Sequence, residues 1–155
     1  MIIIVDGDLL KSDCDIIAHQ CNCLLAFGSG IAGQIRSKLP GAYKEFKEDY
    51  REPLEKLGSF CVANKDIGNF KAIYNLYGQY SYGIGTRQTD YLALRQALTA
   101  MMKDIDDNDV SRTAKIGIPC YMGCGLGGGD WDLVQSMVKE ISDRFSRDIY
   151  IYKLQ

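Results

Sequence analysis

The densest glycine segment of the chain lies between residues 123 and 129, where five of seven residues are glycine. Glycine allows the backbone to approach a ligand closely and to adopt positive φ, so successive N–H groups can converge on an anion. The segment follows an expected strand at residues 116–119 and precedes an expected helix that Asp130 would cap. It lacks the Lys-Ser/Thr ending of a P-loop and the later acidic partner of a dinucleotide fingerprint. The pattern predicts a phosphate-binding loop, with a flexible turn as the alternative.

A second glycine-bearing loop, Gly28-Ser29-Gly30, precedes an expected helix that starts at Ile31 and Ala32. A single loop of this kind is weak evidence. Two of them, both at the change from strand to helix, favour a clamp that holds a diphosphate from both sides, because backbone N–H groups and helix N-termini bind phosphates.

His19 is the only histidine of the chain and ends the second expected strand, three residues before Asn22. An imidazole has an ordinary pKa near 6.5, which suits proton transfer at neutral pH. The alternative is a histidine that is merely held by hydrogen bonds in the core. Both readings stay open at this point.

The six cysteines have neither the spacing of a zinc site nor a second histidine beside them. A chain of this size also has enough apolar residues to fold without disulfides. We therefore expect free thiols, no metal and no cofactor.

Apolar runs and helical spacing alternate along the chain. Strands are expected at residues 2–5, 16–18, 59–63, 72–77, 116–119 and 148–152, and helices at 31–39, 43–50, 91–105 and 131–141. Pro40 and Gly41 are expected to stop the first helix, and Asp90 is expected to cap the helix at 91–105. This alternation predicts an α/β fold with a mostly parallel sheet covered on both faces, and ligands in such folds bind beyond the carboxyl ends of the strands.

The composition is that of an ordinary globular protein, with 155 residues, 46% hydrophobic, 25% charged and a net charge of −2. One domain spanning residues 1–155 is expected. No apolar run approaches the roughly 20 residues of a membrane span, and the first residues lack the pattern of a signal peptide. The basic residues are scattered, which argues against a nucleic-acid partner. We expect a cytoplasmic monomer.

Taken together, the segments resemble the macrodomain family. The resemblance rests on Gly7-Asp8-Leu9, Ala18-His19-Gln20-Cys21-Asn22-Cys23, Gly28-Ser29-Gly30-Ile31-Ala32, Pro119, Gly123-Cys124-Gly125-Leu126 and Ile151-Tyr152, which occur in this order along the chain. It implies a three-layer α/β/α fold with a mixed, mostly parallel central sheet. It also implies binding of ADP-ribose, or of a small molecule or protein that carries ADP-ribose.

The same resemblance implies a role for each matching residue. Asp8 would accept a hydrogen bond from the adenine amino group, Leu9 would cover the base, and Tyr152 would flank it; a turn residue and a core tyrosine are the respective alternatives. Asn22 would reach the distal ribose. The diphosphate and distal ribose would be wrapped by Gly28, Ser29, Gly30, Ile31, Ala32, Gly123, Cys124, Gly125, Leu126 and Gly127, with Pro119 also at the site.

Two branches of the family are the most similar: phosphatases that act on ADP-ribose 1″-phosphate, and hydrolases that remove ADP-ribose from protein carboxylates. The hydrolases have an attacking lysine and an aspartate directly after Gly-Cys-Gly-Leu, and this chain has Gly78-Gln79-Tyr80 and Gly127 there. The resemblance favours metal-free hydrolysis of ADP-ribose 1″-phosphate or of an ADP-ribosyl ester, with His19 and Asn22 as catalytic residues. The alternative is a module that binds ADP-ribose without turnover.

Overall fold

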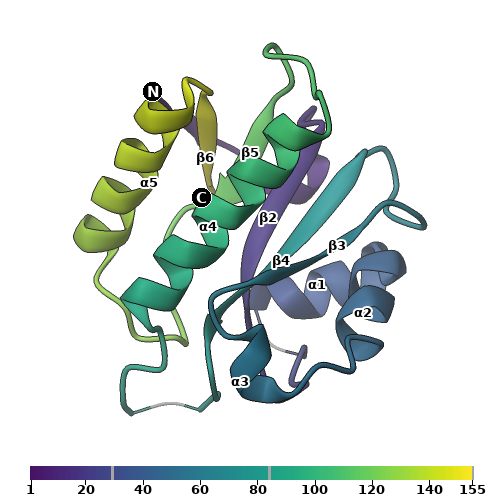
Figure 1. Cartoon of the computed structure of the whole chain (residues 1–155), viewed down its shortest axis with the longest axis vertical. Helices are drawn as coiled ribbons and strands as arrows, with labels where there is room; N and C mark the ends of the chain where they lie inside the picture. Colours follow the sequence, from purple (N-terminus) through teal and green to yellow (C-terminus); the bar gives the residue numbers. More distant parts are fainter. Residues whose placement is uncertain (29, 84, 155) are drawn as a thin grey trace.

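A computed structural model describes residues 1–28, 30–83 and 85–154 of the chain. In these described ranges six strands form one sheet, with helices on both of its faces (Figure 1). The strands are β1 Ile2–Asp6, β2 Ile16–Asn22, β3 Phe60–Ala63, β4 Ala72–Gln79, β5 Ile116–Pro119 and β6 Ile149–Lys153. The helices are α1 Gly30–Lys38, α2 Pro40–Lys47, α3 Pro53–Lys56, α4 Tyr91–Asp107 and α5 Trp131–Phe145, with a short 3-10 turn η1 at Leu9–Lys11.

The strand order is β1-β6-β5-β2-β4-β3. Every neighbouring pair is parallel except β3 and β4, which are antiparallel. The predicted mixed, mostly parallel sheet is therefore confirmed. Because β1, β6, β5, β2 and β4 all run in the same direction, the loops that follow these strands gather at one end of the sheet.

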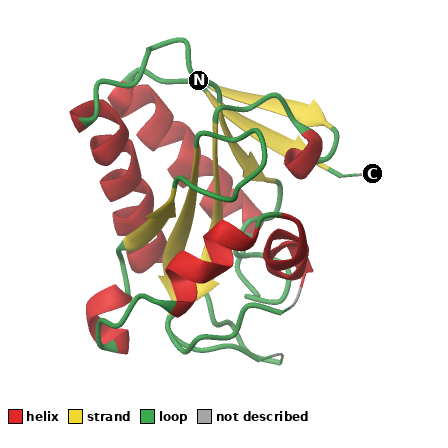
Figure 2. Ribbon diagram, turned by 90° about the vertical axis from the view of Figure 1, so that its right-hand side faces the viewer, coloured by secondary structure: helices red, strands yellow, loops and turns green. Residues whose placement is uncertain are grey.

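The two faces of the sheet carry separate apolar cores, which gives three layers (Figure 2). Helices α4 and α5 cover one face, while α1, α2 and η1 cover the other. Strand β2 serves both cores: Ile16 and Ala18 face α4 and α5, and Ile17 and Cys21 face α1 and α2. The predicted α/β/α layering is confirmed.

Several element boundaries differ from the sequence expectation. Strand β2 runs past Ala18 to Asn22, because its pairing with β4 continues through His19, Gln20 and Cys21. Helix α1 ends at Lys38, and α2 begins at Pro40 instead of residue 43, because a proline is tolerated in the first turn of a helix. Helix α2 ends at Lys47, and the short α3 was not predicted.

The expected helix caps are confirmed. Asp90 accepts a hydrogen bond from the Ala93 amide at 3.0 Å and begins α4. Asp130 accepts one from the Asp132 amide at 2.9 Å and begins α5. The helices of the described residues include none that is long and apolar enough to cross a membrane.

Candidate ligand-binding site

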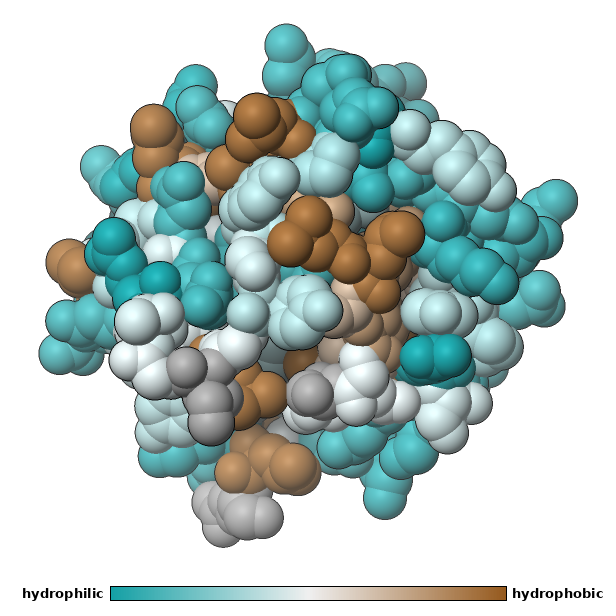
Figure 3. Space-filling model, turned by 90° about the horizontal axis from the view of Figure 1, so that it is seen from below, coloured by the Kyte–Doolittle hydropathy of each residue, from teal (hydrophilic) through white to brown (hydrophobic). Residues whose placement is uncertain are grey.

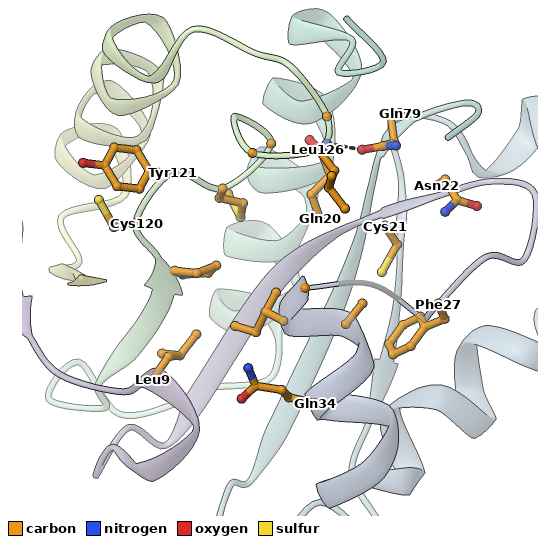
Figure 4. Close-up of a pocket in the computed structure, with 18 of the residues that line it drawn as sticks. Leu9, Gln20, Cys21, Asn22, Phe27, Gln34, Gln79, Cys120, Tyr121 and Leu126 are labelled. Atoms are coloured by element: carbon orange, nitrogen blue, oxygen red, sulfur yellow. Dashed lines mark hydrogen bonds between the residues drawn. The ribbon is translucent and has the colours of Figure 1, made fainter. Parts of the chain in front are cut away.

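A cavity of about 660 Å³ lies at the carboxyl ends of the parallel strands, a volume within the usual range for small-ligand sites (Figure 4). Both glycine-bearing loops line it. The predicted site residues that line it are Asp8, Leu9, Asn22, Gly28, Gly30, Ile31, Ala32, Pro119, Gly123, Gly125, Leu126, Gly127 and Tyr152. Cys124 and His19 do not line it, and Ser29 lies outside the described residues. The chain thus brings most of the predicted residues around one hollow.

The loop of residues 123–129 is shaped by hydrogen bonds from Gln88 and Thr89, which do not line the cavity, to two of its carbonyl groups. The Gly123 carbonyl accepts from Thr89 Oγ1 at 2.6 Å, and the Gly127 carbonyl accepts from the amides of Gln88 and Thr89 at 2.7 and 3.0 Å. Within the described part of the chain, the amides of Gly125, Leu126 and Gly127 donate to no protein acceptor. Those three consecutive amides are therefore available to an anion.

Glycine is required at position 127 of this loop. A Cβ there would lie 2.6 Å from Thr89 Oγ1 and 2.8 Å from the Gly123 carbonyl oxygen. Both distances are shorter than real contacts allow. A side chain at this position would push the loop away from Thr89. The observed conformation of the loop therefore depends on glycine at position 127.

Helix α1 presents its N-terminus to the cavity through Gly30, Ile31 and Ala32. The first amides of a helix have no partner within it and carry the positive end of its dipole. Neither Asp130 nor Trp131 lines the cavity. The helix whose N-terminus lines the cavity is therefore α1 and not α5.

One end of the cavity is formed by Asp8, Leu9 and Tyr152. Asp8 accepts from the Leu10 amide at 2.9 Å, which caps η1, and it is the only charged side chain among the described residues that line the cavity. Tyr152 is buried, and its hydroxyl lies 3.6 Å from Cys14 Sγ. Burial raises the pKa of Tyr152 to about 12, so its phenol stays protonated. Tyr152 lines the cavity and packs in the core at the same time.

The side chain of Asn22 organises the loop that follows β2. Its Nδ2 donates to the Ala26 carbonyl at 2.7 Å, while its Oδ1 accepts from the amides of Leu24 and Ala26 at 2.9 and 3.2 Å. The primary amide has one further N–H to give. Asn22 can therefore contact a ligand through one donor only, and most of its hydrogen bonding shapes the route to Gly28.

His19 lies in the core on the α1 and α2 side of the sheet, with 1% of its surface exposed. Its Nε2 is 2.6 Å from Asn75 Oδ1, and Phe27 packs edge-on at 5.3 Å between ring centres. Burial lowers the pKa of His19 to about 4, so the ring is neutral at physiological pH. This geometry agrees with a histidine held by hydrogen bonds in the core. The expected acid–base role is not supported by any contact between His19 and the cavity.

All six cysteines are free, as expected. Burial raises the pKa of Cys21 well above its ordinary value and raises that of Cys124 to about 11, so both are thiols rather than thiolates. The described residues contain no group of three or more His, Cys, Asp or Glu side chains arranged to hold a metal ion.

Sequence reasoning missed a polar cluster of Gln20, Gln79 and Thr89 beside the glycine loop. Gln20 Nε2 donates to Gln79 Oε1 at 2.6 Å (Figure 4) and also to Thr89 Oγ1 at 2.9 Å. Gln20 and Gln79 line the cavity. Gln20 belongs to the segment between His19 and Asn22 that the sequence analysis singled out. Only the pairing of β2 with β4, however, shows that its side chain meets Gln79.

Three comparisons with known proteins bear on this site. The family model described as the Macro domain matches residues 18–138. An uncharacterized 17.5 kDa protein in the tk-vs intergenic region of Enterobacteria phage T4 is 31% identical over 147 residues, which cover 90% of this chain and 89% of the relative. ADP-ribose 1″-phosphate phosphatase of Saccharomyces cerevisiae is 27% identical over 94% of this chain and 96% of its own length. Among solved structures, the macrodomain of Mycobacterium tuberculosis DarG has the same fold, with a TM-score of 0.79, 22% identity, and coverage of 98% of this chain and 97% of that one.

Proposed function

This chain belongs to the Macro domain family, and on that premise we propose that it binds ADP-ribose and hydrolyses a derivative of it without a metal. The substrate would be ADP-ribose 1″-phosphate or an ADP-ribosyl ester on a protein. The first choice is supported by the similarity to the yeast enzyme named ADP-ribose 1″-phosphate phosphatase.

The observation that carries the proposal is the pair of N–H-presenting backbone segments on opposite sides of one cavity. The amides of Gly125 to Gly127 come from one side and the first turn of α1 comes from the other. A diphosphate between them would be held without any cationic side chain, because backbone amides and a helix N-terminus suffice for phosphate binding.

The single carboxylate of the cavity fixes the direction of the ligand in this proposal. Asp8 would accept from the adenine amino group through the carboxylate oxygen that does not cap η1, with Tyr152 and Leu9 against the base. Gln79 lies across the cavity from Leu9 (Figure 4), so the distal ribose lies toward Gln79 in this proposal.

Hydrolysis of the 1″-phosphate would proceed by attack of water on phosphorus. The bond between phosphorus and the ribose 1″-oxygen breaks, the proton lost by the water ends on the leaving oxygen or in solvent, and inorganic phosphate and ADP-ribose are released. Amides aimed at the developing negative charge lower such a barrier by about 3 kcal/mol for each well-placed donor. In this proposal the remaining N–H of Asn22 is one side-chain donor near the ribose.

The test is calorimetric titration with ADP-ribose and with AMP, followed by an assay of phosphate release from ADP-ribose 1″-phosphate with and without EDTA. We expect binding of ADP-ribose at about −7 to −9 kcal/mol, much weaker binding of AMP, and phosphate release that persists in EDTA. Equal affinities for the two nucleotides would reject the ligand assignment. Loss of activity in EDTA that zinc or magnesium restores would reject the metal-free reaction.

A second candidate is a reader module that binds ADP-ribose without turnover. It is favoured by the burial of His19 and by a lining whose one charged residue, in the described part of the chain, is Asp8. Tight binding of ADP-ribose with no product from either substrate would select it.

We also propose that the protein acts as a monomer in the cytoplasm, on a small molecule or a modified protein rather than on nucleic acid. The net charge of −2 supports the last point. Sedimentation analysis and a mobility-shift assay with DNA and RNA would test these statements.

A further inference from the structure

A second hollow, of about 320 Å³, adjoins the cavity across the glycine loop. It is lined by Gly85, Thr86, Arg87, Gly125, Leu126 and Gly128. Gly125 and Leu126 line both spaces. The second hollow is therefore reached from the same loop whose amides are available to a diphosphate.

The charges of the two spaces are opposite. Among the described residues, the cavity is lined by one charged side chain, Asp8, and the second hollow by one, Arg87. The described part of the chain contains no ion-pair partner for Arg87. A ligand with several negative charges would thus meet its only cationic side chain in the second hollow.

The guanidinium of Arg87 lies over the ring of Tyr91, with its central carbon 4.6 Å from the ring centre. Stacking on an aromatic face restricts the side chain but leaves the in-plane N–H donors free. A guanidinium held in this way can bind two oxygens of a phosphate at once.

The backbone around Arg87 is fixed against the glycine loop. The amides of Gln88 and Thr89 both donate to the Gly127 carbonyl, and Thr89 Oγ1 donates to the Gly123 carbonyl. On the other side, a Cβ on Gly128 would lie 3.2 Å from Arg87 Cα. The position of Arg87 is consequently set by the same contacts that shape the anion-binding loop.

Leu126 lies between the two spaces, because it lines both, and its side chain is exposed. In the view from below, apolar side chains lie in separate groups among polar ones (Figure 3). A substituent on the distal ribose that passes Leu126 would enter the hollow lined by Arg87.

On the basis of the function proposed above, we infer that Arg87 determines specificity by receiving an anionic group carried on the distal ribose. The chemical class that suits a stacked guanidinium is a phosphate monoester, which offers two or more oxygens and close to two negative charges. The preferred ligand is then ADP-ribose with a terminal phosphate, and free ADP-ribose binds more weakly.

The test compares two ligands on each of four proteins: the wild type, Arg87→Gln, Arg87→Lys and Arg95→Gln. Calorimetry measures the affinity for ADP-ribose and for the non-hydrolysable phosphonate analogue of ADP-ribose 1″-phosphate. Arg95→Gln is the matched control, because it removes the same charge from an exposed residue of α4 whose partner is Glu140.

We expect the wild type and Arg95→Gln to bind the phosphonate about 10-fold more tightly than ADP-ribose. In Arg87→Gln this preference should disappear while the affinity for ADP-ribose is unchanged, and Arg87→Lys should retain part of it. A preference that survives in Arg87→Gln overturns the inference. So does an equal weakening of both ligands, which would place Arg87 at the diphosphate or in a structural role. If the wild type binds neither ligand, the proposed function itself is wrong, and the ADP-ribose titration alone shows it.

Discussion

His19 should make the stability of this protein sensitive to mild acid. The ring is buried, its Nε2 bonds to Asn75, and burial lowers its pKa from 6.5 to about 4. In the unfolded chain the histidine regains its ordinary pKa and takes up a proton first. Stability is therefore complete well above pH 6.5 and is lost as the pH falls toward the lowered value.

The size of this effect follows from the two pKa values. A difference between 6.5 and about 4 corresponds to about 3 kcal/mol once the pH lies below both values. Between about pH 7.5 and about pH 5 the loss from this one group is about 2 kcal/mol. Carboxylates titrate mainly below this range, so most of the change should come from His19.

The assay is urea unfolding across this pH range, for the wild type and for His19→Gln. Glutamine can still donate to Asn75 but does not titrate, so any fixed cost of the substitution cancels in the comparison. The difference in unfolding free energy between the two proteins should shrink by about 2 kcal/mol from about pH 7.5 to about pH 5. A difference that stays constant with pH would refute the argument. Phosphate release is a second readout: an acid–base role predicts a fall of roughly 10²–10⁴-fold in His19→Gln, and the buried geometry predicts turnover near that of the folded wild type.

Two further substitutions test the cavity. Asp8→Asn keeps an oxygen that can cap η1 but removes the charge, and Asp8→Ala removes both; calorimetry should show ADP-ribose binding weakened by about 1–3 kcal/mol in both, with thermal stability lowered mainly in Asp8→Ala. If Asp8→Asn binds as well as the wild type, the carboxylate does not contact the adenine. Gly127→Ala would bring a Cβ to 2.6 Å from Thr89 Oγ1, so we expect about 1–3 kcal/mol of destabilisation together with weaker ADP-ribose binding. Gly125→Ala, whose Cβ would meet nothing within 4 Å, is the control for stability, and equal unfolding free energies for the two variants would contradict the packing argument.

The sequence predicted the layered fold well because its evidence is local. Period-2 and helical spacing identified the strands and the long helices, and Asp90 and Asp130 marked the starts of α4 and α5. Strand boundaries that depend on pairing with another strand could not be predicted in this way. Strand β2 reaches Asn22 only because β4 lies beside it as far as Gln79.

In the candidate site, too, the features set by the local sequence were predicted and those set by tertiary contacts were not. Glycines act through the backbone, so their positions in the sequence were enough to place both loops at the strand ends, and both line the cavity. Side chains depend on what covers them. His19 shares a face of β2 with Ile17 and Cys21, and Phe27 packs against its ring, which nothing in the local sequence reveals. Gln20 and Gln79 meet because β2 pairs with β4. Arg87 lies beside the glycine loop because the amides of the next two residues, Gln88 and Thr89, donate to the Gly127 carbonyl.

The hydrogen bonds that hold the carbonyls of Gly123 and Gly127 also bear on how fast a ligand binds. Because Thr89 and Gln88 already make these bonds in the free protein, the loop loses its conformational freedom during folding and not during binding. A ligand then meets donors that are already arranged, and its arrival does not wait for the loop to become ordered. Association rates should therefore be similar for related ligands, and differences in affinity should be found in how long each ligand stays bound.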